Sequence, residues 1–234
     1  MGFKIVYLAI TIIGCSGPTV SGGQVGSIAV DFIKTSGYNT ITDTAQGTIY
    51  NFDGRLIIKV TSPLLQYMII DSLETIVYYP NERKVLIIRR TVRSFIPLFQ
   101  TFVGFFRNDN PIPVLNFRIS ESQRKGDSLI TRWTPRDKKV KFSGNLEMIY
   151  WRDMPVSTTS YDRKGRIVAQ MLYSQDTTIN GRHVPLHISS RLIQGKDALI
   201  ETMSFRSLAL DADIPPEVRG FKVPDDINPE IVQW

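Results

Sequence analysis

Apolar and polar residues alternate with a period of two along most of this chain. From about residue 40, β-branched and aromatic residues fill short runs at 56–58, 67–70, 76–79 and 85–88. Turn-forming residues such as Asp53-Gly54 and Pro80-Asn81 separate these runs. A second series of runs occupies residues 115–120, 128–133, 138–143, 145–152, 156–162, 166–174, 184–193 and 197–206. Alternation bounded by such turns predicts antiparallel strands joined by hairpins.

Two segments depart from this period. Residues 24–35 place Val25, Ile28, Ala29, Phe32 and Ile33 at spacings of three and four, which predicts an amphipathic helix. Residues 95–106 are apolar almost all round and contain five phenylalanines, which predicts a buried helix without a polar face. The last twenty residues, 215–234, are rich in proline and acidic side chains and predict an extended tail.

About a dozen antiparallel strands and two helices make this a mainly β protein. A sheet with so many strands has to curl. The pattern therefore predicts a curled antiparallel half-barrel whose helices cover an apolar interior, and such interiors are frequent ligand sites.

The first fifteen residues have the pattern of a lipoprotein signal peptide. Lys4 precedes a short apolar run at 5–13, which is too short to cross a bilayer. The run ends in Ile12-Ile13-Gly14-Cys15, which resembles a bacterial lipobox. We expect a signal peptide at 1–14, a lipidated and flexible tether at 15–23 with Cys15 as the anchor, and one domain at 24–234. The alternative is a chance thiol after an ordinary signal or in a buried N-terminal strand.

Composition and charge narrow the possible functions. The 234 residues are 42% hydrophobic and 21% charged, with a formal net charge of +6. The basic residues are spread, and their clusters at 89–93 and 136–141 are typical of solvated strand edges. No zinc-finger spacing, recognition helix or RNA-binding aromatic motif is present, so nucleic-acid binding is not expected.

Catalytic and metal-binding patterns are weak. His183 and His187 lie four residues apart on a predicted strand, but no third ligand accompanies them. The chain has no G-x-S-x-G elbow, P-loop, G-x-G-x-x-G or H-E-x-x-H motif. The sequence therefore predicts a protein that is not an enzyme and uses neither a metal nor a cofactor.

Several short motifs follow one another in a familiar order. They are Gly47-Thr48-Ile49-Tyr50, Val60-Thr61-Ser62-Pro63, Tyr67-Met68-Ile69-Ile70-Asp71, Tyr78-Tyr79-Pro80-Asn81 and, near the end, Phe205 and Gly220-Phe221-Lys222-Val223-Pro224-Asp225. Their order and spacing resemble the lipoprotein-localisation, or LolA/LolB-like, carriers. The resemblance covers about residues 40–220 and is closest over 47–90.

The resemblance implies an eleven-stranded half-barrel whose apolar cavity holds the acyl chains of lipoproteins under lid helices. Residues 95–106 stand where the family has lid helices. Combined with strand alternation, this gives the candidate lining residues Ile58, Tyr67, Ile69, Val77, Tyr79, Phe99, Phe102 and Phe106. Alternation leaves open whether the opposite face of each strand lines the cavity. It also leaves open a closed core in which these residues pack on one another.

Two further features follow from the resemblance. The acceptor members project an apolar turn into the membrane, and Leu64 and Leu65 are the matching candidates here; their alternative is plain strand core. The shuttle members fasten their lid with an Arg-Pro near the position of Phe52-Asp53. Because Arg55 is offset from that position, an arginine-latched lid is not expected.

The sequence as a whole predicts a monomeric outer-membrane lipoprotein that faces the periplasm and is held through Cys15. Its partners would be lipoprotein acyl chains or phospholipid, which it would carry or accept for sorting. Two alternatives stay open: an envelope sensor or binding module, and a structural lipoprotein without cargo.

Overall fold

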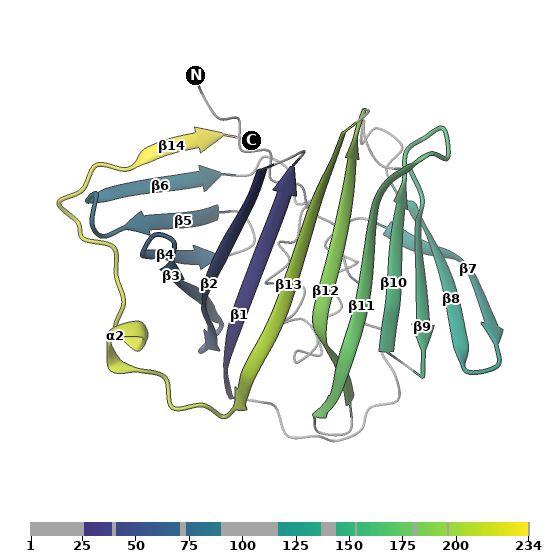
Figure 1. Cartoon of the computed structure of the whole chain (residues 1–234), viewed down its shortest axis with the longest axis horizontal. Coiled ribbons are helices and arrows are strands. Elements are labelled where there is room, and N and C mark those ends of the chain that lie inside the picture. Colours follow the sequence, from purple (N-terminus) through teal and green to yellow (C-terminus); the bar gives the residue numbers. More distant parts are fainter. Residues whose placement is uncertain are drawn as a thin grey trace. The chain divides into compact units, whose positions relative to one another are not determined.

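The computed structural model describes residues 26–38, 41–70, 74–89, 117–136, 144–152, 154–179, 182–195 and 197–233. Strands dominate these residues (Figure 1). The strands in the N-terminal part are β1 (Ser27–Tyr38), β2 (Ile41–Phe52), β3 (Arg55–Ser62), β4 (Gln66–Ile70), β5 (Glu74–Tyr79) and β6 (Lys84–Arg89). Those that follow are β7 (Phe117–Lys125), β8 (Ser128–Pro135), β9 (Leu146–Trp151), β10 (Met154–Tyr161), β11 (Ile167–Ile179), β12 (Arg182–Gln194), β13 (Asp197–Leu210) and β14 (Glu230–Gln233).

The described strands form one open sheet. Its order is β14-β6-β5-β4-β3-β2-β1-β13-β12-β11-β10-β9-β8-β7, so β14 and β7 are its two different ends. Hairpin neighbours pair antiparallel, whereas β14 pairs parallel with β6. The prediction of a mainly β, open half-barrel sheet is confirmed, although the sheet has fourteen strands where the resemblance implied eleven.

The chain divides into two compact units. The first unit holds β1 to β6, Leu186–Ile188 of β12, and the chain from Glu201 onward. The second unit holds β7 to β11, the rest of β12, and the start of β13.

Short-range turn chemistry sets the hairpins of the first unit. Asp53 and Gly54 both have positive φ, 47° and 76°, as a two-residue turn between twisted strands requires. A bulge at Gln46 and Gly47 shifts the register of β2 against β3. A Cβ at position 47 would lie 2.1 Å from the Lys59 carbonyl oxygen, so this position needs glycine. The glycine that begins the first family-like motif therefore has a structural reason.

The helix predicted at residues 24–35 is wrong, because β1 occupies Ser27–Tyr38. The residues that the core buries are Ile28, Val30 and Phe32, at 1%, 0% and 2% exposure and a spacing of two. β1 pairs with β2 over twelve residue pairs. Pairing over this length outweighs a local helix pattern, since Val, Ile and Phe also favour strands.

The C-terminal residues, which were predicted to form an extended tail, contain a short helix and a strand. We name residues 211–233 the C-terminal strap; it contains the short helix α2 (Pro216–Arg219) and ends in β14. Figure 1 shows this yellow segment passing from β13 through α2 to β14, beside β6. Residues 221–224, which resembled a closing strand of the family, follow α2 without strand structure. The helix predicted at 95–106 lies outside the described residues.

Candidate functional site

One face of the first unit is a buried, largely aliphatic surface. The register places Val30 beside Ile49, Ile49 beside Ile58, and Met68 between Ile58 and Val77. We name this side of β1–β6, with the same side of β13, the aliphatic face. Its deeply buried members are Ile28, Val30, Phe32, Ile49, Leu56, Ile58, Val60, Ile70, Val77, Met203 and Phe205, each at most 5% exposed.

The structure separates the predicted lining residues. Ile58 and Val77 lie on the aliphatic face at 0% and 5% exposure, and Tyr79 shares their side of β5. Tyr67 and Ile69 lie on the opposite face of β4. Ile69, for example, pairs with Ile57 and Ile76, whose side chains point away from the aliphatic face. Phe99, Phe102 and Phe106 lie outside the described residues. Alternation predicted which residues share a face within a strand, but not which face of β4 matches that of β5.

The C-terminal strap covers the opposite face. Ile214 and Val218 of the strap pack with Phe52 and Ile57 in one buried cluster. Half-buried residues packed against this cluster include Tyr50, Tyr67, Ile69 and Phe221. The rings of Tyr67 and Phe221 stack with centroids 4.4 Å apart and planes 18° apart. Tyr67 and Ile69 are therefore partners of the strap.

Arg55 fastens this strap. Its guanidinium donates to the carbonyl oxygens of Arg219, at 3.4 Å, and Phe221, at 3.0 Å. Ion pairs between Arg83 and Asp226 and between Lys84 and Glu230 hold the strap further along, toward β14. Whether Arg55 also contacts a lid stays untested, because the predicted lid segment lies outside the described residues. Its contact with the strap depends on residues 164 and 166 positions away in the sequence, so no local pattern indicated it.

An ion pair stands at one end of the aliphatic face. Lys34 on β1 lies on the same side as Val30 and Phe32, and its Nζ is 2.5 Å from Glu201 Oε1. The Ser36 hydroxyl donates to the same oxygen at 3.2 Å. The side chains of Lys34 and Glu201 are 17% and 10% exposed. Sequence analysis missed this pair, because nothing local links β1 with β13.

The opposite end of the same face is also polar. Asn51 and Thr75 are 7% and 3% exposed there, and both have partners. Among the described residues of the first unit, the aliphatic rows thus lie between two polar ends, and one of these ends holds an ion pair.

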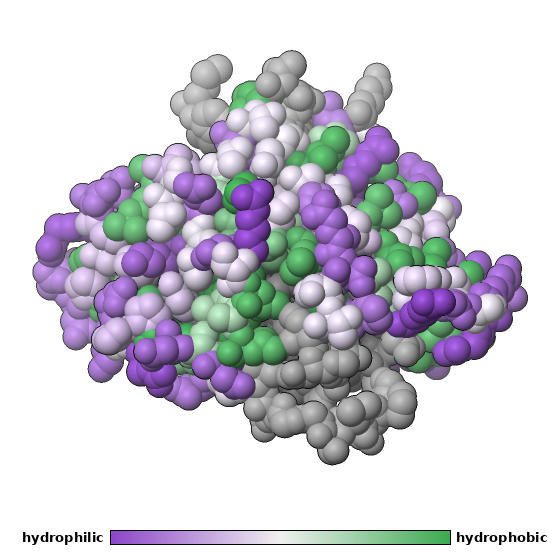
Figure 2. Space-filling model, turned by 60° about the horizontal axis from the view of Figure 1, so that its bottom comes forward, coloured by the Kyte–Doolittle hydropathy of each residue, from purple (hydrophilic) through white to green (hydrophobic). Residues whose placement is uncertain are grey.

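Leu64 and Leu65 lie in the turn between β3 and β4. Leu64 is 50% exposed, and Leu65 is half-buried. The turn begins with a cis peptide bond between Ser62 and Pro63. Leu64 is therefore not strand core, whereas membrane contact by this turn stays a prediction. Other hydrophobic residues also reach the surface, where Figure 2 shows them (green) among hydrophilic residues (purple).

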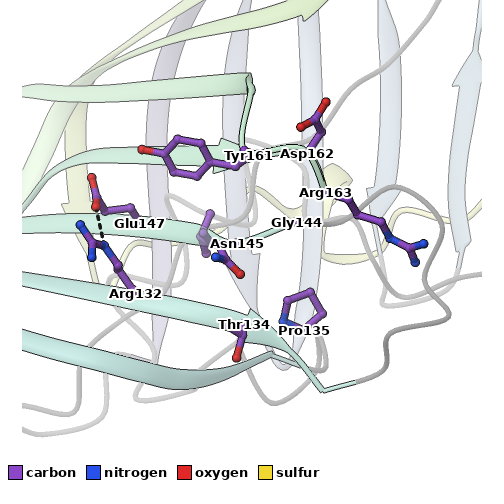
Figure 3. A pocket seen from close by; sticks show the side chains of 11 residues that line it. Arg132, Thr134, Pro135, Gly144, Asn145, Glu147, Tyr161, Asp162 and Arg163 are labelled. Carbon is purple, nitrogen blue, oxygen red and sulfur yellow. Dashed lines mark hydrogen bonds and ion pairs between the residues drawn. The ribbon is translucent and has the colours of Figure 1, made fainter.

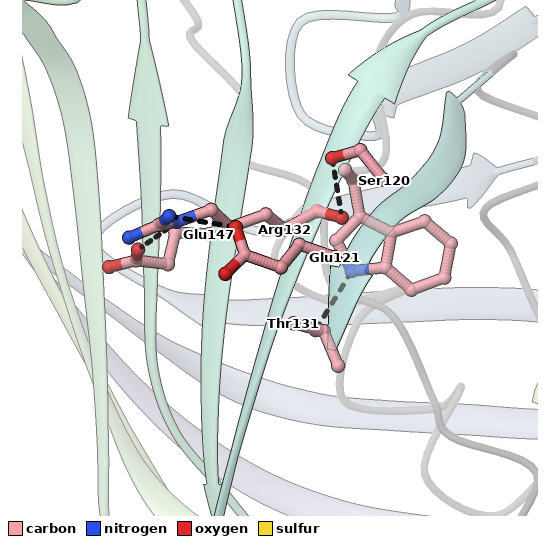
Figure 4. Close-up of polar contacts among 6 residues, drawn as sticks. Ser120, Glu121, Thr131, Arg132 and Glu147 are labelled. Carbon is pink, nitrogen blue, oxygen red and sulfur yellow. Dashed lines mark hydrogen bonds and ion pairs between the residues drawn. The ribbon is translucent and has the colours of Figure 1, made fainter. Parts of the chain in front are cut away.

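The second unit buries a different chemistry. Its buried strand side chains include aromatic, sulfur and hydroxyl groups, and we name this side the aromatic face: Thr131, Trp133, Met148, Tyr150, Thr158, Met171 and Tyr173. Trp133 Nε1 donates to Thr131 Oγ1 at 2.9 Å (Figure 4). The hydroxyls of Thr158 and Tyr173 are 3.3 Å apart. Burial raises the pKa of Tyr173 well above its ordinary value.

A pocket opens elsewhere in the second unit, with a volume of about 790 Å³. Figure 3 shows Glu147 on β9 beside Arg132 on β8, with Tyr161 on β10, the next strand beyond β9. Arg132 is already neutralised, because it contacts Glu147 at 3.0 Å and Glu121 at 2.9 Å (Figure 4). Asp162 accepts hydrogen bonds from the backbone N–H groups of Lys164 and Arg166, and its pKa is lowered mainly by the second of these. Arg132 is thus paired across neighbouring strands, and Asp162 is hydrogen-bonded within its turn.

The histidines do not form a metal site in the part of the chain that the structure describes. His183 Nδ1 is 2.7 Å from Asp176, and His187 Nδ1 is 2.9 Å from the Ser204 hydroxyl. No group of three metal-ligating side chains occurs among the described residues. Those residues also include no helix with the length and hydropathy needed to span a membrane.

The open sheet defines the class of fold, an antiparallel half-barrel, and solved structures share it. A LolA superfamily protein from Nitrosomonas europaea matches with a TM-score of 0.56 and 13% identity, over 83% of this chain and 90% of that one. A DUF1329 family protein from Desulfovibrio piger gives 0.59 and 14%, over 83% and 90%. A putative outer membrane lipoprotein-sorting protein domain from Vibrio parahaemolyticus gives 0.58 and 9%, over 83% and 89%.

These comparisons establish the LolA/LolB-like fold that the motif order indicated. A scan of family models and a search of curated proteins found no match to the sequence.

Proposed function

We propose that this chain is a lipid-anchored envelope protein that binds acyl chains of lipoproteins or lipids on its aliphatic face. It would carry or accept them for sorting to the outer membrane, without covalent chemistry. The observation that carries the proposal is the aliphatic face itself. In its central row Val30, Ile49, Ile58 and Val77 are buried aliphatic side chains, and the half-buried Met68 between Ile58 and Val77 adds a thioether but no hydrogen-bond donor. The shared fold supports it, because two of the similar structures are described as a LolA superfamily and a lipoprotein-sorting protein.

The chemistry of an acyl carrier explains why such a face is needed. Each CH₂ group moved from water to an apolar surrounding gains about 0.8 kcal/mol, so a long chain never leaves a membrane for water on its own. A carrier has to offer surroundings almost as apolar as the membrane, so that each transfer is nearly balanced. Hydroxyl or amide groups in the lining would lose hydrogen bonds when a hydrocarbon chain enters.

Two contacts with the membrane belong to the proposal. Cys15 would carry acyl chains that anchor the protein, and two or more chains give stable attachment. Leu64, exposed at the β3–β4 turn, would touch the bilayer. Replacing Cys15 with alanine should remove the acyl mass and move the protein from the membrane fraction to the soluble fraction. A wild-type protein whose intact mass equals that of the unmodified polypeptide would contradict lipidation.

Lipid extraction from the purified full chain tests the central claim. We expect acylated peptide or phospholipid to copurify, and the delipidated protein to bind the neutral apolar dye N-phenyl-1-naphthylamine with a rise in fluorescence. Ile58→Thr, on the aliphatic face, should weaken dye binding. Ile130→Thr, at a half-buried position of β8, serves as the matched control and should not. An empty protein that binds no dye would favour a structural or sensory role.

A further inference from the structure

The Lys34–Glu201 pair lies between the deeply buried part of β1 and the exposed part of β2. Phe32, two residues before Lys34, is 2% exposed. Ala45, which pairs with Lys34, is half-buried, and residues 41–44 that continue β2 are all exposed. On β13, Met203 follows Glu201 on the same side and is 0% exposed. The pair therefore stands where the aliphatic rows end and contact with water begins.

The hydrogen-bonding capacity of the pair is only partly used among the described residues. Lys34 and Ser36 both contact the same carboxylate oxygen, Glu201 Oε1. An ammonium group has three N–H donors, and a carboxylate has two acceptor oxygens. With side chains 17% and 10% exposed, the pair is largely withdrawn from water, although part of each side chain remains accessible. Hydrogen bonds from a charged donor in such surroundings are stronger than at an open surface.

We propose that the Lys34–Glu201 pair binds the polar junction of an acylated amphiphile, which is the ester or amide group where its acyl chains begin. The assignment rests on the proposed function. Chains lying along the aliphatic rows would bring their carbonyl oxygens to this end of the face, where the Lys34 ammonium donates to them. Because Glu201 neutralises Lys34, the pair suits an uncharged ester or amide better than a free carboxylate.

Paired probes test the assignment in the full chain by displacement of N-phenyl-1-naphthylamine. Methyl laurate carries an ester, and dodecane is a hydrocarbon of similar length without one. In the variant Lys34→Met with Glu201→Gln, the affinity for methyl laurate should fall about tenfold, as loss of one charge-assisted hydrogen bond implies. The affinity for dodecane should stay within about twofold. Equal shifts for both probes, or no shift for either, would overturn the assignment.

A matched control uses the exposed pair Lys84–Glu230, whose side chains are 51% and 59% exposed. Lys84→Met with Glu230→Gln should leave the preference for methyl laurate unchanged; an equal loss would overturn the assignment. A second test variant, Lys34→Gln with Glu201→Gln, keeps two polar side chains in case the first does not fold, and should also lose the preference. If neither probe displaces dye from the wild-type protein, the proposed function itself fails.

Two further ligands distinguish whether the natural ester belongs to a lipoprotein or to a phospholipid. They are a synthetic diacylglyceryl-cysteine peptide and a short-chain phosphatidylethanolamine. Both carry ester carbonyls beside their chains. A tenfold loss in the Lys34→Met, Glu201→Gln variant for either ligand supports the assignment and identifies the source. Loss for neither ligand argues against it.

Discussion

The two units bury contrasting side chains on one face of their strands. In the first unit, the central row of the aliphatic face, from Val30 to Val77, holds aliphatic side chains and Met68, with no hydroxyl, indole or amide group. In the second unit, the aromatic face carries hydroxyl, indole and sulfur groups that bond one another, such as Trp133 with Thr131 and Thr158 with Tyr173. Polar groups that hydrogen-bond to one another favour one particular packing arrangement. Apolar contacts are non-directional, so a hydrocarbon surface can accept different apolar partners. This contrast is the reason why the proposed acyl-binding surface is assigned to the first unit.

The Lys34–Glu201 ion pair lies at one polar end of the aliphatic face and gives the largest expected effect. Lys34→Met leaves the Glu201 carboxylate, in a residue 8% exposed, without its counter-charge. We expect a loss of about 3 kcal/mol in the free energy of unfolding, measured by urea denaturation. Adding Glu201→Gln should recover most of that loss, because no unpaired charge then remains. A double variant as unstable as the single one would contradict this.

A hydroxyl introduced into the aliphatic face tests whether this face, unlike the aromatic face, excludes polar groups. Ile58→Thr removes a methyl-sized volume at a position with 0% exposure and buries a hydroxyl among aliphatic side chains. Together these changes should lower the free energy of unfolding by about 2.5 kcal/mol. Chemical denaturation with an unchanged m-value would verify the loss. A loss below about 1 kcal/mol would mean that this face tolerates polar groups.

The reverse change removes a hydroxyl from the aromatic face. Thr158→Val keeps the shape of the side chain at 0% exposure but takes away one partner of the Tyr173 hydroxyl, which also donates to Met171 Sδ at 3.2 Å. The expected loss is about 1.5 kcal/mol, since a buried hydroxyl loses a hydrogen bond. The further variant Thr158→Val with Tyr173→Phe should cause less than the sum of the two single losses. Strict additivity would show that the two hydroxyls do not interact.

The pH dependence of stability gives the smallest effect. The raised pKa of Tyr173 means that this phenol stays protonated in the folded protein at pH values where the unfolded chain ionises, above about pH 10. The unfolded state then binds fewer protons, so stability falls as pH rises, by about 1.4 kcal/mol per pH unit from this group. Tyr173→Phe should reduce the slope between pH 10 and 11. An unchanged slope would assign the titration to other residues.

Much of the fold could be predicted because strand alternation and turn residues are local. The alternating runs from residue 56 to 88 became β3 to β6, and Asp53-Gly54 formed the expected tight turn. The helix predicted at 24–35 was wrong because the deciding contacts are not local. The apolar residues of this segment fit both a helical and a strand period, and pairing with β2 made the segment a strand.

The candidate site was harder to predict, because each strand has two faces. Ile58 and Val77 lie together on the aliphatic face, while Tyr67 and Ile69 turn to the strap. Which face is which depends on register between strands, and a difference of one residue exchanges the faces. The strap that covers Tyr67 could not be read from the proline-rich composition of residues 215–234.

The sequence by itself determined the β class, most of the hairpins and the family-like order of motifs, since these depend on residues close along the chain. Only the tertiary structure decided that β1 is a strand, that Arg55 holds the C-terminal strap, and that Lys34 meets Glu201. Those outcomes join residues far apart in sequence, and contacts of that kind are fixed by strand pairing and burial, which no local pattern records.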